Sequence, residues 1–303
     1  ASWIGTIYVF FTICCATCYW IAGMTGFESI VHSMTTIATG GFSTSDSSIG
    51  IFINPYIEII AIVFMIIGSL PFFVYVMAAR GQTRRLFADT QIHWFFYVLF
   101  FTILAITFWQ VFNNNSSFLI ALRQASFNVT SIITGTGYSS TNYWEWGGFP
   151  GIVFLFLMFI GGCAGSTSCS IKLFRYQILY ATMRAQLASL IRPHHVYIPK
   201  YNGEPISANI SDTVFAFFFL FLLTYACLAF LLSLLGLDFI TSISSAATAI
   251  TNVGPGLGSI VGPAGTFSPL PDSAKWLLAF GMLFGRLEIF VILVLFTRSF
   301  WKN

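Results

Sequence analysis

Three segments of the chain share an ending that could hold a dehydrated cation. In each, a run rich in serine and threonine leads into a turn of small residues, at residues 35–41, 131–137 and 248–254. A cation that sheds its water needs a ring of oxygen atoms. Backbone carbonyls point into such a ring only where the chain adopts dihedral angles that glycine permits. The repetition therefore predicts an ion site built from backbone oxygens.

The elements ahead of these turns must deliver them without crossing a membrane. Before the first turn, apolar residues recur at helical spacing at Phe27, Ile30, Val31, Met34 and Ile37. Such a helix is roughly 16 Å long at about 1.5 Å per residue, or about half a bilayer. Irregular backbone at that depth is tolerated only inside protein or beside water, so the turn is expected to line a pathway. The partial negative charge at the C-terminal end of the helix favours a cation there.

Composition predicts an all-α integral membrane protein. Hydrophobic residues make up 57% of the 303 positions and charged residues only 8%, which leaves too little polar surface for a soluble globule. Six apolar stretches are each close to the ~20 residues that a spanning helix needs. They cover residues 4–21, 59–77, 94–111, 152–173, 214–235 and 277–296. The net charge of +3 is not gathered into one basic patch, so no nucleic acid partner is expected.

The distribution of basic residues predicts the orientation of the chain. Arg80 follows the second apolar stretch, Arg184 the fourth and Lys302 the sixth. Because cytoplasmic ends of membrane helices carry an excess of basic residues, we assign these ends to the cytoplasm. The three glycine turns then lie on the outer side of the membrane.

One unit organises the chain: a span, a short outer helix, a glycine turn and a second span. Aligned on Gly40, Gly137 and Gly254, the unit occurs three times. We expect membrane repeats at residues 1–85, 86–192 and 211–303, with a broken last helix in the second repeat and a cytoplasmic connection at residues 193–210. A single glycine turn would be interpreted as an ordinary outer loop. Three of them favour the ion site.

Two features inside the apolar stretches break the expected pattern. Residues 161–170 are small and polar in the middle of the fourth stretch, and close helix packing through Gly161 and Gly165 is one interpretation. Arg286 lies near the middle of the last stretch, where a charge requires a water-filled cavity or a partner. A partner on another helix would make Arg286 part of a structural ion pair.

Enzymatic interpretations lack the residues that they need. Residues 135–137 have the Gly-x-Gly form found in dinucleotide sites, but no strand is predicted before them. His32 and Ser33 have only Glu28 as a nearby acid, and no catalytic pair occurs at a matching depth. We therefore predict that the protein is not an enzyme.

With these motifs the chain resembles the Trk/Ktr/HKT superfamily of potassium transporters over essentially its whole length, and most closely the bacterial TrkH and TrkG pore subunits. The resemblance rests on the three turns, on residues 161–169 and on Arg286. It implies tandem helix, pore-helix, helix repeats, four in number, around a central ion pore like that of potassium channels. Three repeats are present here, so the first would precede Ala1 in a longer protein.

The resemblance also implies roles for individual residues. A filter that binds potassium would be formed by Ala38, Thr39, Gly40, Gly135, Thr136, Gly137, Asn252, Val253 and Gly254. A gate loop beneath the filter would comprise Gly161, Gly162, Cys163, Ala164, Gly165, Ser166, Thr167, Ser168, Cys169 and Ser170. Arg286 would face the pore and tune its ion occupancy. Because the three turns differ in sequence, the filter is expected to leak some sodium.

Function, partners and location follow from the same resemblance. It implies potassium uptake across the bacterial inner membrane, with potassium as the bound ion and no organic cofactor. The implied partners are a cytoplasmic nucleotide-binding ring of the TrkA type, a second copy of the chain in a homodimer, and the lipid bilayer. An ion-coupled secondary carrier with a midplane site is the alternative, although carriers usually contain inverted repeats and these three copies share one orientation. A non-conducting scaffold would leave the glycine turns without a function.

Overall fold

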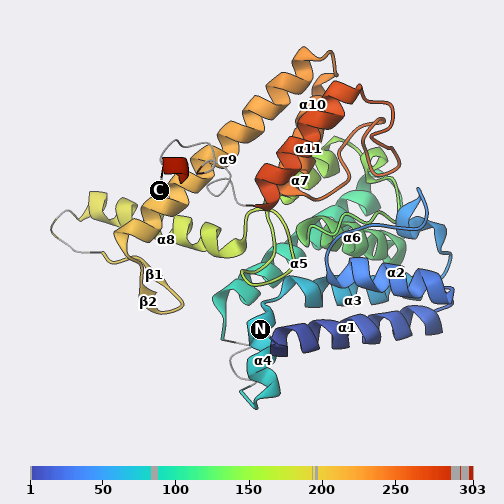
Figure 1. Ribbon diagram of the computed structural model, residues 1–303, viewed down its shortest axis with the longest axis horizontal. Coiled ribbons are helices and arrows are strands. Elements are labelled where there is room, and N and C mark those ends of the chain that lie inside the picture. Colours follow the sequence, from blue (N-terminus) through green and yellow to red (C-terminus); the bar gives the residue numbers. More distant parts are fainter. Residues whose placement is uncertain are drawn as a thin grey trace.

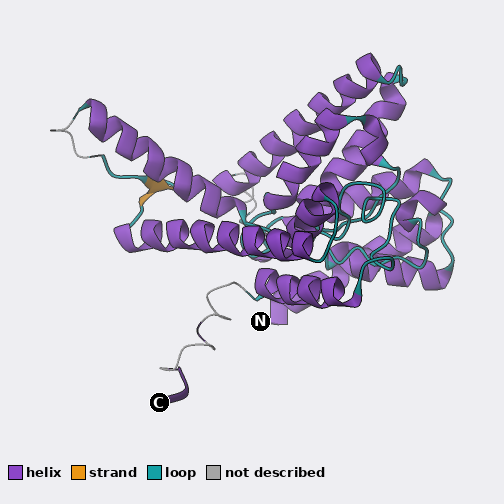
Figure 2. Cartoon of the chain, turned by 90° about the horizontal axis from the view of Figure 1, so that it is seen from above, coloured by secondary structure: helices purple, strands orange, loops and turns teal. Residues whose placement is uncertain are grey.

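The computed structural model describes residues 2–82, 88–192, 194, 197–287, 294 and 300–302. Helices make up almost all of the regular structure of these residues, which confirms the all-α expectation (Figure 1, Figure 2). The α-helices are α1 (Ser2–Ile21), α2 (Gly26–Ile37), α3 (Pro55–Ser69), α4 (Phe72–Ala79), α5 (Thr90–Asn113), α6 (Phe118–Ile133), α7 (Gly148–Phe159), α8 (Leu173–Ile191), α9 (Ala208–Leu234), α10 (Phe239–Thr251) and α11 (Asp272–Arg286). The remaining elements are the 3₁₀ helices η1 (Ser48–Ile51), η3 (Tyr143–Trp146) and η4 (Phe300–Lys302) and an antiparallel hairpin of β1 (Lys200–Tyr201) and β2 (Glu204–Pro205).

The described helices repeat one order: a long helix, a short helix, and then a return helix. The order is α1, α2 and α3 with α4, then α5, α6 and α7, then α9, α10 and α11. Each short helix packs against the helices before and after it, and neighbouring units meet where α3 contacts α6 and where α7 contacts α10. The predicted repeat boundaries at residues 85/86 and 193 fall outside the described residues. α9 begins at Ala208, within the predicted cytoplasmic connection.

The second predicted span is bent sharply. Three described helices, α1, α5 and α9, are long and apolar enough to cross a membrane, and α3 with α4 would make a fourth span although they are bent by 89°. The apolar stretch predicted as a span at residues 59–77 is therefore not one continuous helix. The bend occurs because Pro71, just before α4, has no backbone N–H to continue the ladder of α3. The freed carbonyls of Gly68 and Ser69 accept from the backbone amides of Thr167 and Cys163, at 3.2 Å and 3.0 Å.

The fourth and sixth predicted spans are also not continuous helices in the described chain. α7 ends at Phe159 and α8 begins at Leu173, and residues 160–172 between them are not helical. We call this segment loop 160–172. It lies where the small polar run interrupts the apolar pattern. α11 ends at Arg286, so this residue stands at the end of the described helix rather than in its middle. Most of the remainder of the predicted span at 277–296 lies outside the described residues.

Local sequence explains where two of the short helices begin. Thr25 caps α2, and its side chain and that of Glu28 accept each other's backbone amides. The hydrogen bonds from Thr25 hold the pKa of Glu28 below its ordinary value. Asp238 caps α10 by accepting from the backbone amide of Thr241 at 3.1 Å. Each helix therefore starts at the preceding loop and carries a glycine turn at its C-terminal end.

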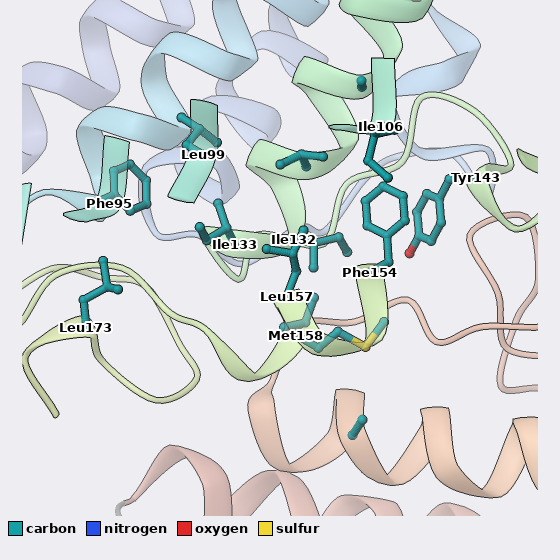
Figure 3. Close-up of a cluster of buried hydrophobic side chains, with 14 of the residues drawn as sticks. Phe95, Leu99, Ile106, Ile132, Ile133, Tyr143, Phe154, Leu157, Met158 and Leu173 are labelled. Atoms are coloured by element: carbon teal, nitrogen blue, oxygen red, sulfur yellow. The ribbon is translucent and has the colours of Figure 1, made fainter. Parts of the chain in front are cut away.

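A buried apolar cluster holds the second unit together (Figure 3). It gathers side chains of α5, α6, η3, α7 and α8, including Phe95, Leu99, Ile106, Ile132, Ile133, Tyr143, Phe154, Leu157, Met158 and Leu173. The rings of Tyr143 and Phe154 lie with their centroids 4.2 Å apart. Because close-packed interiors resist displacement, α6 is a rigid support for the turn that follows it.

Candidate functional site

One hydrogen bond closes each of the three glycine turns in the same way. In every turn a backbone amide donates to the carbonyl oxygen five residues earlier. The distances are 2.7 Å from Gly40 to Thr35, 3.0 Å from Thr136 to Ser131 and 3.2 Å from Val253 to Thr248. The three turns are therefore structurally equivalent, and this bond sets their register.

The backbone angles confirm that register and correct the sequence alignment. The residue before each bonded amide has a positive φ, which is 49° at Thr39, 72° at Gly135 and 56° at Asn252. The residue after it also has a positive φ, which is 66° at Gly41, 81° at Gly137 and 115° at Gly254. Gly41, rather than Gly40, is thus the equivalent of Gly137 and Gly254. The alignment on Gly40 is wrong by one residue, and Ala38 belongs to the helical end of α2.

The turns lie side by side in chain order. A Cβ atom added to Gly41 would stand 1.8 Å from the carbonyl oxygen of Thr136, and one added to Gly137 would stand 1.9 Å from that of Val253. Only glycine permits backbones to approach so closely. Gly254 has no such neighbour in the described chain, since the nearest atom to its added Cβ is 3.8 Å away. A cleft of about 320 Å³ is lined by residues of all three turns, including Gly40, Gly41, Thr136, Gly137, Val253 and Gly254.

Loop 160–172 reaches the C-terminal ends of all three short helices. The Thr167 hydroxyl donates to the carbonyl of Ile37 at 2.9 Å, and the Thr39 hydroxyl donates to the carbonyl of Thr167 at 2.9 Å. At the third helix, the backbone amide of Ser170 donates to the carbonyl of Thr251 at 3.1 Å. The loop packs against the end of the second helix, because a Cβ on Gly135 would lie 3.1 Å from the Cβ of Cys169. The loop therefore covers the inner ends of the three turns.

Gly161 allows loop 160–172 to fold closely on itself. The amide of Gly161 donates to the carbonyl of Ile171 at 2.9 Å, and a Cβ at Gly161 would lie 2.2 Å from the carbonyl oxygen of Cys169. A Cβ at Gly165 would meet no atom of the described chain within 4 Å. Helix packing through Gly161 and Gly165 is therefore wrong as an explanation of this run. The Gln91 side chain on α5 also holds the loop, accepting from the amide of Ala164 at 2.8 Å.

Two cations contact the middle of the loop: Lys172, which is the last residue of the loop itself, and Arg286 of α11. Lys172 donates to the carbonyl and hydroxyl oxygens of Ser168, and Arg286 donates to the sulfur of Cys169. Arg286 lies close to the loop because α11 packs tightly against α10 at the preceding Gly285. A Cβ on Gly285 would lie only 1.8 Å from the carbonyl oxygen of Ile250 on α10. No carboxylate of the described residues pairs with Arg286, so the structure does not show the ion pair considered as an alternative. A space of about 240 Å³ lies beside these cations and the loop.

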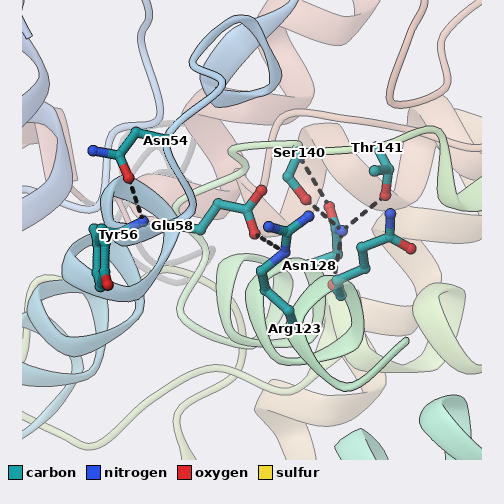
Figure 4. A network of polar contacts seen from close by, with 8 residues as sticks. Asn54, Tyr56, Glu58, Arg123, Asn128, Ser140 and Thr141 are labelled. Atoms are coloured by element: carbon teal, nitrogen blue, oxygen red, sulfur yellow. Dashed lines mark hydrogen bonds and ion pairs between the residues drawn. The ribbon is translucent and has the colours of Figure 1, made fainter. Parts of the chain in front are cut away.

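A polar network behind the second turn was not predicted from the sequence (Figure 4). Glu58 at the start of α3 is 3.3 Å from Arg123 on α6, which joins the first unit to the second. One turn of helix further on, the Asn128 amide donates to the hydroxyls of Ser140 and Thr141, at 3.1 Å and 3.3 Å. The network anchors the chain that leaves the second glycine turn. The partners are separated in the sequence and their residue types are common, so no local sequence pattern predicts the network.

Fold and site together define a class of protein. Spanning helices, short helices whose C-terminal ends meet, and irregular backbone enclosed between them are the features of a multi-pass membrane protein of the transporter and channel type of fold. The TrkH family of cation transport proteins matches residues 1–302, and the chain belongs to this family.

Individual relatives agree with this assignment. The Trk system potassium uptake protein TrkI of Halomonas elongata is 47% identical over 299 residues, which cover 98% of this chain and 61% of the relative. TrkH of Escherichia coli K12 is 35% identical over 305 residues, 100% of this chain and 62% of that protein. The crystal structure of the potassium transporter TrkH from Vibrio parahaemolyticus superposes with a TM-score of 0.92 at 35% identity, over 98% of this chain and 64% of that one.

These matches confirm the resemblance drawn from the sequence. The family is one of transporters rather than enzymes, and its bacterial members place this chain in a bacterial membrane as a multi-pass protein. The chain spans less than two thirds of the length of the relatives described above.

Proposed function

We propose that the chain forms part of a pathway for potassium uptake, with the three glycine turns as its filter. The observation that supports this most is the succession of close contacts from Gly41 to the Thr136 carbonyl and from Gly137 to the Val253 carbonyl. It brings backbone oxygens of different units together at the negative ends of three helices, where a cation is favoured. The relatives TrkI and TrkH are named as potassium uptake proteins.

In this proposal the ion sites are formed by Thr39, Gly40 and Gly41, by Gly135, Thr136 and Gly137, and by Asn252, Val253 and Gly254. Gly41 replaces Ala38 in the predicted set because the hydrogen bonds shift the first turn by one residue. A further unit, from residues outside this chain, would stand against the open side of Gly254 and complete the ring. The differing side chains of the three turns favour a filter that passes some sodium.

Loop 160–172 is the proposed gate. Its bonds to Ile37 and Thr251 and its packing against Gly135 place it across the inner ends of the turns, so potassium passes only when the loop moves. Glycine and small hydroxyl residues suit a segment with two conformations. Arg286 beside Cys169 adds a fixed positive charge below the turns, which would lower cation occupancy there.

We further propose that the assembly contains two copies of the pore subunit and a TrkA-type nucleotide-binding ring on the cytoplasmic side. Both proposals rest on membership of the family. The ring would act on the gate through the cytoplasmic ends of the helices that flank it.

The test is potassium and sodium flux through the full-length protein in proteoliposomes, comparing the wild type with Gly137→Ala. A Cβ at this position collides with the third turn, so potassium selectivity should fall. Gly236→Ala is the matched control, because Gly236 also has a positive φ, 87°, but its Cβ would meet no described atom within 4 Å. Equal selectivity in the wild type and both variants would overturn the filter assignment. Unitary rates of channel magnitude would exclude the carrier alternative.

A further inference from the structure

A separate pocket of about 580 Å³ lies at the cytoplasmic end of α5, far along the chain from the glycine turns. Its walls are the first turn of α5, one face of α8 and the β1–β2 hairpin, which lies beside α8 in Figure 1. The lining includes Trp94, Gln177, Tyr180, Arg184, Lys200 and Asn202. None of these residues belongs to the filter or to loop 160–172.

The pocket is held in shape by contacts between its walls. Asn202, at the tip of the hairpin, accepts from the backbone amide of Thr90 at 3.2 Å and also from the hydroxyl of Thr90. The rings of Trp94 on α5 and Tyr180 on α8 meet edge to face with centroids 5.6 Å apart. The hairpin and both helices are thus joined, and the pocket is a built feature rather than a gap between loose segments.

Three polar side chains at this pocket carry donors that have no acceptor in the described chain. Neither Arg184 nor Lys200 has a carboxylate within ion-pair distance in the described chain. Gln177 is only 6% exposed, and its Nε2 has no hydrogen-bond partner among the described residues. A buried donor without an acceptor is costly, and Arg184 on α8 and Lys200 on the hairpin bring two positive charges to the same pocket. An oxygen-rich anion would satisfy all three groups.

The depth of the pocket indicates the source of that anion. Thr90 is the first residue of a spanning helix, so the pocket opens where α5 leaves the membrane on the side assigned to the cytoplasm. Tryptophan and tyrosine gather at the level of lipid headgroups, as Trp94 and Tyr180 do here. Basic pockets between helices on this side of a membrane suit acidic lipid headgroups.

We propose that this pocket binds the phosphate group of an anionic membrane lipid. Arg184 and Lys200 pair with the phosphate, Gln177 donates to one of its oxygens after a small rotation of the amide, and Trp94 and Tyr180 pack against the glycerol backbone. Arginine and lysine form strong charge-assisted hydrogen bonds with phosphate oxygens.

The bound headgroup also has a short route to loop 160–172. Asn202 of the hairpin accepts from Thr90, and the next residue on α5, Gln91, accepts from the amide of Ala164 in the loop. An occupied pocket steadies the hairpin and therefore Gln91, which stabilises the loop in the conformation seen here. This second step, unlike the binding itself, rests on the proposed function of the loop as a gate.

The binding test is native mass spectrometry of the full-length protein titrated with dioctanoyl phosphatidylglycerol. We expect roughly fivefold weaker binding for each of Arg184→Gln and Lys200→Gln, which remove one charge near a lipid phosphate. Gln177→Leu keeps the packing of α8 and should weaken binding by a similar factor if its amide donates. Arg192→Gln is the control, because Arg192 ends the same helix but does not line the pocket.

Competition and flux separate the remaining outcomes. Displacement of the lipid by millimolar inorganic phosphate would identify free phosphate as an equal ligand, whereas no displacement supports the lipid. Equal lipid binding in the wild type and in all three pocket variants would overturn the proposal. If those variants bind lipid normally but lose a protein partner, the pocket is a protein-binding site and the lipid proposal is wrong. If binding is lost while potassium flux is unchanged, the lipid site stands and only its link to the loop is wrong.

Discussion

The hydroxyl of Tyr138 lies 2.6 Å from the hydroxyl of Thr35. Tyr138 directly follows the second glycine turn, whereas Thr35 is on α2 and supplies the carbonyl that closes the first turn. The tyrosine is fully buried, and its hydroxyl also donates to the carbonyl of His32 at 3.2 Å. Phe42, which follows the first turn, is instead 74% exposed. The buried contact of Tyr138 with Thr35 and His32 therefore acts as a brace between the first and second units.

Tyr138→Phe should loosen the first turn without removing the ring. The variant loses the hydroxyl contacts of Tyr138, each worth about 1 kcal/mol, while the Thr35 hydroxyl keeps its bond to the carbonyl of Phe42 at 2.9 Å. We expect a higher ratio of sodium to potassium flux and a modest loss of thermal stability. Flux in proteoliposomes and a thermal melt measure the two effects. Tyr56→Phe, at a tyrosine that is 67% exposed, is the control, and equal effects in both variants would show that the brace has no role.

Gly41→Ala and Gly40→Ala test the corrected register. Alanine at 41 would need a positive φ, which costs about 1–2 kcal/mol, and would collide with the Thr136 carbonyl. Alanine at 40 would make ordinary van der Waals contacts, with the ring of Phe42 at 3.4 Å and the carbonyl oxygen of Thr35 at 3.8 Å. Potassium-dependent growth of an uptake-deficient strain should be lost with Gly41→Ala and kept with Gly40→Ala. The reverse result would restore the alignment on Gly40.

Thr167→Val should favour movement of the loop. Valine keeps the shape of threonine but cannot donate to the carbonyls of Ile37 and Gly68, which the hydroxyl contacts at 2.9 Å and 3.0 Å. Losing about 1 kcal/mol would raise the population of the moved loop roughly fivefold. Single-channel or proteoliposome flux should rise accordingly. Thr224→Val on α9, where the hydroxyl donates only to the preceding turn of its own helix, should leave flux unchanged.

Arg286→Ala should raise cation flux, because it removes a positive charge from beside the loop and frees Cys169. The effect should shrink as salt increases if it is electrostatic, since mobile ions screen exposed charges. Lys275→Ala provides a control at a half-buried cation near the start of α11, which pairs with Asp272 rather than with the loop. Unchanged flux in a folded and inserted Arg286→Ala protein would contradict a role for this charge in the pathway.

Much of this architecture was predictable because it depends on local chemistry. Long apolar runs predict α1, α5 and α9, since a bilayer requires about 20 such residues for a crossing. The spacing of apolar residues before Gly40 predicts a helix too short to span, and α2 has 12 residues. Small polar residues at 161–170 interrupt α7 and α8 because they neither favour a helix nor bury apolar surface.

Contacts between distant segments decided the features that the sequence left open. Gly40 and Gly41 offer two registers, and the carbonyl of Thr136 selects one of them. The bend before Pro71 is stable because Cys163 and Thr167 supply donors for the carbonyls that it frees. Local sequence thus determined which segments are helical and where the chain can turn. Tertiary packing decided how the turns meet, because the contacts that join one turn to the next, such as Gly41 against the Thr136 carbonyl and Tyr138 against Thr35, are made between different units.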